Sequence, residues 1–144
     1  MVPPRWLLRI GWAIHRALFA ATGGRVGAQP PRERRPGTLF LVTTGRRSGQ
    51  RRRNGVFYLE DGPDLVVVAS NAGAATDPGW WLNLQAHPDA EVQLGPTPRP
   101  VRARRASSEE TVRLWPRLVA VNSAFDEYRA AAGREIPVVI LEPR

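Results

Sequence analysis

Short apolar runs bounded by turn residues follow one another along the chain from residue 38 onward. Six of them have the length and the content of β-branched and aromatic residues typical of strands: 38–44, 54–60, 64–70, 90–95, 99–106 and 136–142. Asp61 and Gly62 predict a hairpin turn between the second and the third, and Val66, Val67 and Val68 predict a strand buried on both faces. Because short connections favour antiparallel neighbours, the pattern predicts a mainly β fold with peripheral helices, built on a small closed barrel.

Helical patterns interrupt the strands at three places: 77–88, from 107 onward, and 124–132. In the first, Asp77 is expected to be the N-cap and Pro78 to occupy the first helical position. In the second, Ser107 and Glu110 form a capping box, and Pro116 inside the pattern predicts a kink or an early break.

The N-terminal part has a different character. Residues 5–21 predict an amphipathic helix that is too short and too charged to span a bilayer, and its basic residues interrupt the apolar stretch that a secretory signal needs. Two interpretations stay open: a helix packed on its own domain, which is favoured, or a helix on a membrane surface with Trp6 and Trp12 at the interface. The Gly-, Pro- and Arg-rich residues that follow predict a connector, so the chain is expected to divide into 1–37 and a barrel domain at 38–144.

Composition narrows the choice of partners. The 144 residues carry a formal net charge of +8, and all 21 basic residues are arginines. Arginine binds phosphate and carboxylate groups through a planar fork, so an anionic partner is expected: a phosphorylated cofactor, a nucleic acid or an acidic membrane surface. The absence of cysteine excludes disulfides and thiolate metal sites and favours a cytoplasmic location.

The loop at 43–53, TTGRRSGQRRR, holds the strongest candidate for an anion site. Backbone amides freed by Gly45 and Gly49, the Ser48 hydroxyl, and the guanidinium groups of Arg46 and Arg47 are suited to surround an anion. The loop has neither the GK[ST] ending of a phosphate-binding P-loop nor a GxGxxG fingerprint. The alternative is a solvated hairpin tip whose arginines point outward.

Other chemistries have little support in the sequence. The basic run before Phe57 and Tyr58 satisfies only the loosest form of a nucleic-acid surface, and no recognised RNA or DNA module surrounds it, so no nucleic-acid partner is expected. His15 and His87 lack acidic partners at metal-ligand spacing. The serines have no nucleophile-elbow context. If the chain is an enzyme, a cofactor is expected to carry the chemistry.

Three stretches occur in the same order as in a known family: TTGRRSGQRRRNGVFY, VVVASNAGAATDPGWWLNLQAHPDAEVQLG and LWPRLVAVNSAFDEYRAAAGREIPVVILEP. They resemble the deazaflavin-dependent nitroreductase family, whose members use coenzyme F-420. The resemblance spans residues 38–143. It implies a split β-barrel related to the flavin reductases and pyridoxamine oxidases. It also implies hydride transfer from the reduced 8-hydroxy-5-deazaflavin coenzyme to a quinone, a nitro compound or an activated alkene.

The resemblance also implies roles for single positions. The arginine-rich loop would hold the phosphate and the acidic polyglutamate tail of the coenzyme, and the strand end from Ala69 onward would lie along its ring. For Trp80 and Trp81 the alternative is a place in the core. The cofactor-binding positions are Thr44, Arg46, Arg47, Ser48, Gly49, Gln50, Arg51, Phe57, Ala69, Ser70, Asn71, Gly73, Gly79, Trp80 and Trp81. The acceptor would contact Asn122, Phe125 and Tyr128, with Tyr128 as the candidate donor of a proton or hydrogen bond.

Several positions depart from the family pattern. Lysine is frequent at the positions of Arg47 and Asn71, and the second exchange removes a positive charge. Proline is frequent at the positions of Arg51 and Gly55. The three acceptor positions are frequently all tyrosine, and here only Tyr128 keeps the phenol, so the acceptor preference of nitro-reducing members is not expected to transfer.

Two other functions remain open at this point. One is an oxidoreductase that uses flavin mononucleotide (FMN) in the same barrel. The other is a non-catalytic binder of deazaflavin or lipid, held at the inner face of the cell membrane through residues 5–21. A monomer is slightly favoured over a homodimer.

Overall fold

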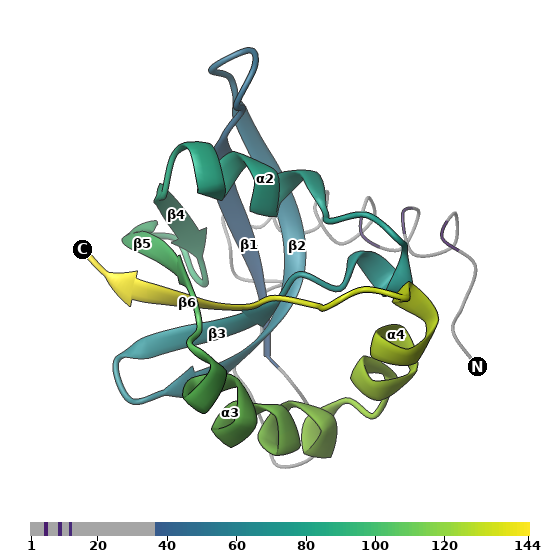
Figure 1. Cartoon of the computed structure of the whole chain (residues 1–144). Helices are drawn as coiled ribbons and strands as arrows, with labels where there is room; N and C mark the ends of the chain where they lie inside the picture. The colour runs from purple at the N-terminus through teal and green to yellow at the C-terminus, as the bar shows by residue number, and fades with distance from the viewer. Residues whose placement is uncertain (1–4, 6–8, 10–11, 13–36) are drawn as a thin grey trace.

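Six antiparallel strands form a closed barrel in the computed structural model, which describes residues 5, 9, 12 and 37–144 (Figure 1). The barrel order is β1-β2-β3-β6-β5-β4. The strands are β1 (Gly37–Thr44), β2 (Arg51–Asp61), β3 (Asp64–Val68), β4 (Asp89–Gln93), β5 (Arg99–Arg105) and β6 (Val138–Pro143). All six predicted strands are therefore confirmed, and so is the predicted closed antiparallel barrel.

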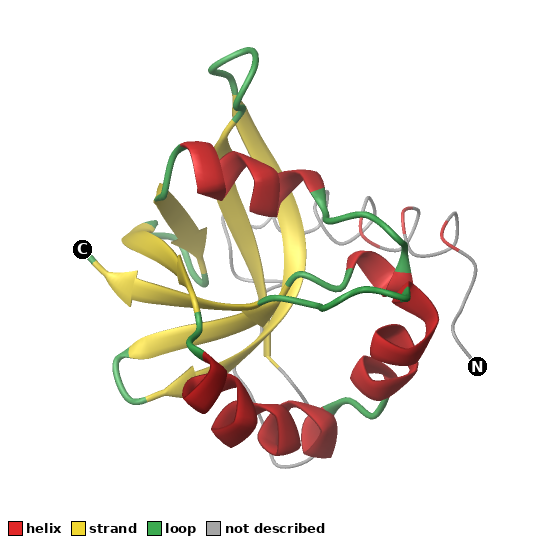
Figure 2. Cartoon of the chain, viewed as in Figure 1, coloured by secondary structure: helices red, strands yellow, loops and turns green. Residues whose placement is uncertain are grey.

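Three α-helices and one short 3-10 helix accompany the barrel: η1 (Asn71–Gly73), α2 (Gly79–Ala86), α3 (Ser108–Val121) and α4 (Ala124–Ala132). Figure 2 shows α2 lying across the barrel near the hairpin that joins β1 to β2, while α3 and α4 cover the opposite side. The capping box of Ser107 and Glu110 is confirmed at the start of α3. At Pro116, where a kink or an early break was expected, the break is wrong, because α3 continues past it to Val121; the kink stays a prediction.

The predicted start of α2 is also wrong. Pro78 is the N-cap, and the first helical residue is Gly79. The carboxylate of Asp77 instead accepts a hydrogen bond from Nη1 of Arg134 at 2.7 Å. This ion pair joins residues 57 positions apart, and it takes the carboxylate away from the helix end.

The barrel is split along β2. Its pairing with β1 is continuous from Gly37 opposite Tyr58 to Thr44 opposite Arg51. Its pairing with β3 is confined to Leu59, Glu60 and Asp61. The residues of β2 before Leu59 therefore bond to β1 on one side only among the described strands, and the other side of this stretch borders an opening in the barrel wall.

Two apolar clusters lie on opposite faces of the sheet. One fills the barrel and includes Leu39, Val67 and Trp81, with α2 closing the end of the barrel. The other lies between the outer face of β3 and β6 and helices α3 and α4, and it includes Val66 and Leu114. Successive residues of β3 point into different clusters, which confirms the prediction that this strand is buried on both faces.

Of the predicted N-terminal helix, only Arg5, Arg9 and Trp12 are described, and all three are helical. The rest of 5–21 and the connector up to residue 36 lie outside the described residues. Within the described part of the chain, no helix is both long and apolar enough to cross a membrane.

Candidate functional site

A cleft of about 970 Å³ opens where the β1–β2 hairpin, the split side of β2, η1, and the starts of α2 and α4 meet. Eight of the fifteen predicted cofactor-binding residues line it: Arg46, Arg47, Ser48, Phe57, Ser70, Asn71, Gly79 and Trp80. Two of the three predicted acceptor residues, Phe125 and Tyr128, line it as well. The sequence segments that carried the prediction are therefore brought together around one opening.

The hairpin at one end of the cleft is held by its own backbone. Gly45 donates to the carbonyl of Gln50 at 2.7 Å and accepts from the amide of Gly49 at 2.8 Å. The Ser48 hydroxyl accepts from the amide of Gln50 at 3.2 Å. Gly49 has φ +69°, a conformation that side-chain-bearing residues rarely adopt, and a Cβ on Gly45 would lie 2.8 Å from Ser48 Oγ. The two glycines are required by the turn, and Arg46 and Arg47 stand on a fixed loop.

Asn83 ties this loop to α2. Its side chain is 5% exposed, and its Oδ1 accepts from the backbone amide of Arg46 at 3.1 Å and from Nη1 of the same residue at 3.0 Å. Its Nδ2 donates to Thr43 Oγ1 at 3.1 Å. Asn83 thus aims the Arg46 guanidinium. Sequence reasoning missed it, since an asparagine within WLNLQ gives no sign of a partner on β1.

The turn after β3 has an unusual backbone. Asn71 and Ala72 have φ +48° and +54°, and Gly73 follows at +81°. A Cβ on Gly73 would lie 3.3 Å from Tyr128 Cα, so the missing side chain allows η1 and α4 to approach closely. Left-handed non-glycine residues cost free energy and cluster at functional sites.

Arg134 holds this turn together and was missed by sequence reasoning. Its guanidinium is largely buried, pairs with Asp77, and donates to backbone carbonyls along the turn. The carbonyl acceptors are those of Ala69 at 3.2 Å, Ser70 at 3.3 Å, Ala74 at 3.1 Å and Thr76 at 3.0 Å. One side chain therefore fixes the segment that borders the cleft.

Aromatic side chains form the α4 end of the cleft. Phe125 and Tyr128 are buried, with an edge-to-face contact and ring centroids 6.4 Å apart. Burial, and secondarily the charge of Glu127, raises the pKa of Tyr128 above its ordinary value. Its phenol is therefore protonated at neutral pH and able to donate.

The remaining predicted residues lie away from the cleft lining. Arg51 pairs with Glu91 at 2.7 Å, Trp81 packs in the barrel core, and Asn122 is the C-cap of α3, with its Oδ1 accepting from the Ala124 amide. Trp81, predicted as a cofactor-binding residue, therefore occupies the core position that was the alternative for it. The other predicted residues outside the lining are Thr44, Gly49, Gln50, Ala69 and Gly73.

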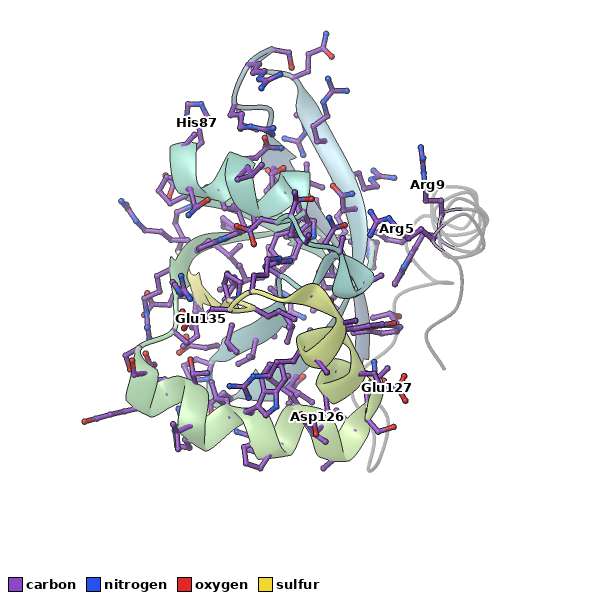
Figure 3. The ribbon with its side chains drawn as sticks, turned by 45° about the vertical axis from the view of Figure 1, so that its right-hand side comes forward. Arg5, Arg9, His87, Asp126, Glu127 and Glu135 are labelled. Carbon is purple, nitrogen blue, oxygen red and sulfur yellow. The ribbon has the colours of Figure 1, made fainter. Side chains whose placement is uncertain are left out.

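The charged residues in the described lining of the cleft are all positive. Its described lining contains six arginines and no carboxylate: Arg5, Arg9, Arg46, Arg47, Arg52 and Arg53. Arg5 and Arg9 come from the N-terminal segment (Figure 3). No cluster of His, Cys, Asp or Glu among the described residues has the arrangement of a metal site, and His87 is exposed at the end of α2. The cleft is suited to an anionic organic ligand.

Comparison with known proteins identifies a family. The family described as F420H(2)-dependent quinone reductase matches residues 12–143. The chain belongs to this family. A Mycobacterium tuberculosis protein named as an F420H(2)-dependent quinone reductase is 36% identical over 148 residues, covering 97% of each chain.

Solved structures agree with the family match. A structure described as an F420-H2 dependent reductase superposes with a TM-score of 0.66 and 32% identity, covering 73% of this chain and 93% of that one. Another, described as a domain-swapped dimer, has a TM-score of 0.71 and 29% identity, covering 95% and 97%. A Listeria innocua protein assigned as a pyridoxamine 5'-phosphate oxidase shares the fold alone, at 14% identity and a TM-score of 0.53 over 74% and 83%.

These comparisons confirm the predicted family, fold class and coenzyme, and they give no support to the FMN alternative. The cleft fits coenzyme F-420. Its arginine-rich end suits the phosphate and acidic tail of that coenzyme, and its aromatic end suits a flat ring. The oligomeric state of this chain stays a prediction.

Proposed function

We propose that this protein is an enzyme that uses reduced coenzyme F-420 to reduce a quinone by two electrons. The observation that carries the proposal is one cleft with two unlike ends. Among its described lining residues, one end has arginines on a fixed loop and no carboxylate, and the other has buried aromatic rings and a protonated phenol. A coenzyme with an acidic tail and a flat redox ring matches both ends in one orientation.

In this orientation, Arg46 and Arg47 bind the acidic tail, and the turn at Ser70 and Asn71 borders the ring. When bound, the reduced deazaflavin supplies a hydride from C5. The protein holds the acceptor over the ring and keeps water away, which supplies orientation and a low-dielectric environment. Tyr128 Oη donates a hydrogen bond to the acceptor oxygen that gains negative charge. That oxygen takes up a proton supplied by solvent, so hydride plus proton convert the quinone to the quinol and complete the two-electron reduction.

The acceptor preference is part of the proposal. The buried aromatic end favours flat, electron-poor molecules, of which a quinone is the first choice and a nitro compound or an activated alkene the next. Phe125 and Asn122 offer no phenol, so Tyr128 is the only hydroxyl donor among the three acceptor positions. We therefore expect faster turnover of quinones, which need one strong donor near a carbonyl oxygen, than of nitro compounds.

The test of the coenzyme site compares two double variants with the same loss of charge. Arg46→Ala with Arg47→Ala removes two arginines of the cleft, whereas Arg99→Ala with Arg102→Ala removes two exposed arginines of β5. Titration with coenzyme F-420, followed by ring fluorescence, should show binding weakened on the order of 100-fold for the first pair, because charge-assisted bonds are lost. The affinity should also depend less on salt. Equal affinities for both pairs would contradict the site.

Turnover separates an enzyme from a coenzyme-binding protein. Loaded protein is assayed against a panel of quinones and nitro compounds, with Tyr128→Phe as the variant. We expect Tyr128→Phe to lower kcat about 10-fold or more, the loss expected when one hydrogen bond to a charged oxygen is removed, while coenzyme affinity stays within about twofold. Tight coenzyme binding without turnover of any acceptor would favour a non-catalytic binder.

A further inference from the structure

Arg5 makes a long-range contact at the η1 end of the cleft. Both of its terminal nitrogens donate to one residue: Nη1 to the backbone oxygen of Asn71, and Nη2 to the Asn71 side-chain oxygen at 3.0 Å. Figure 3 shows the Arg5 side chain lying beside the barrel. The contact joins positions 66 apart in the chain, so no local sequence signal predicts it.

The charge of Arg5 is not neutralised by this contact. Asn71 is uncharged, and no carboxylate belongs to the described lining. A guanidinium has five N–H donors, and the two bonds to Asn71 leave the others free for a ligand. Asn71 is itself held, because its Nδ2 donates to the Thr76 carbonyl at 3.0 Å. The fork of Arg5 therefore presents a fixed positive charge to the cleft.

Trp12 anchors the same segment on β2. A Cβ added to Gly55 would overlap the six-membered ring of Trp12, and the Trp12 ring lies 5.5 Å from the ring of Phe57, centroid to centroid. The backbone of Gly55 is not left-handed, so its conformation does not require a glycine. The close approach of the Trp12 ring, which leaves no room for a side chain, explains why this position is a glycine. Arg5 and Trp12 are helical and seven residues apart, a spacing that puts both on one face of a helix.

We propose that Arg5 is a coenzyme-binding residue and that it binds the oxygen-rich edge of the deazaflavin ring. The packing of Trp12 against Gly55 holds Arg5 in place. The inference rests on the proposed function. The ring offers carbonyl oxygens and an ionisable hydroxyl group, which are acceptors for a guanidinium. The cleft then has two separate cationic binding sites: Arg46 and Arg47 bind the tail, and Arg5 binds the ring.

Two probes distinguish the two cationic binding sites: the complete coenzyme, and the 8-hydroxy-5-deazariboflavin chromophore without phosphate or glutamates. Affinities are measured by ring fluorescence for the wild-type chain, Arg5→Ala, and Arg46→Ala with Arg47→Ala. Arg5→Ala should weaken binding of both probes about 10-fold, the size expected for one charge-assisted contact. The double variant should weaken only the complete coenzyme. Loss confined to the complete coenzyme in Arg5→Ala would overturn the assignment to the ring.

Arg9→Ala is the matched control, since Arg9 also lines the cleft, whereas the described hydrogen bonds of Asn71 include Arg5 and not Arg9. An equal loss in Arg9→Ala and Arg5→Ala would mean that only the overall charge matters, and it would overturn the proposal. Asn71→Lys in the Arg5→Ala background returns a cation to the same place and should restore most of the affinity. Failure of this rescue, with the variant folded, also counts against a charge role.

The anchor is tested by Gly55→Ala, which displaces Trp12. This variant should reproduce the loss seen for Arg5→Ala, and combining the two should add little, because both remove the same contact. Full additivity would refute the anchoring role of Trp12. If the wild-type chain binds neither probe, the proposed function fails; if it binds both and Arg5→Ala matches it, only this inference fails.

Discussion

The amide of Asn83 has a partner for each of its polar atoms, and two of its three bonds go to Arg46. A buried amide left half satisfied costs free energy, so the network holds the loop and the guanidinium in one arrangement. The strands and loop glycines that carry Arg46 were predictable from local pattern. Asn83 was not, because its partner Thr43 lies 40 positions away and becomes a neighbour only when α2 crosses the barrel.

We expect Asn83→Ala to weaken coenzyme binding about 10-fold and to lower the free energy of unfolding by about 1–3 kcal/mol, because Arg46 and Thr43 lose a buried partner. Ring-fluorescence titration and urea unfolding measure the two effects. Gln85→Ala, an exposed change on the same helix, is the control and should alter neither. Lower stability with unchanged affinity would show that Asn83 supports the fold without aiming Arg46.

The strands and helices were predicted correctly wherever the sequence features that specify them lie within a few residues of one another. Alternation and β-branched runs gave all six strands, and Ser107 with Glu110 gave the start of α3. The errors occurred where distant contacts outweigh a local signal. Asp77 has the sequence of an N-cap but pairs with Arg134, and β2 begins at Arg51 because it pairs with β1 along the whole of that strand.

The start of α3 also predicts behaviour in acid. Hydrogen bonding with Arg104, and then with the Ser107 backbone, lowers the pKa of Glu110 to about 2 from 4.5. A lowered pKa in the folded state means that the contribution to stability is complete above about pH 4.5 and is lost as the pH falls toward 2.

Glu110→Gln should therefore lose less stability than the wild-type chain between about pH 4.5 and pH 2. Urea unfolding across this range measures the difference, which should shrink at high salt because the pair is partly exposed. Glu109→Gln is the control, since Glu109 has no ion pair within the described part of the chain. The prediction fails if both variants follow the wild-type curve.

At the scale of the whole molecule, the cleft draws on segments from residue 5 to residue 128. The cationic end could be foreseen from the arginine-rich loop alone. The aromatic end could be assigned only through the family resemblance, since nothing local marks Phe125 or Tyr128 as cleft residues. The contribution of Arg5 and Trp12 could not be foreseen, because it depends on docking across the open side of the barrel.

The incomplete pairing of β2 has a consequence for amide hydrogen exchange. Between Arg51 and Phe57, alternate amides point away from β1 toward the split, and in the free protein we expect these amides to take up deuterium quickly. Coenzyme binding should slow them, whereas the amides of Leu59 to Asp61, which lie in the stretch paired with β3 and outside the cleft lining, should change little. Mass spectrometry of peptic fragments distinguishes this local slowing from uniform protection, which would contradict it. Deuterium uptake at the split would then measure how much of the protein has coenzyme bound, without exciting the ring with light and without adding an acceptor.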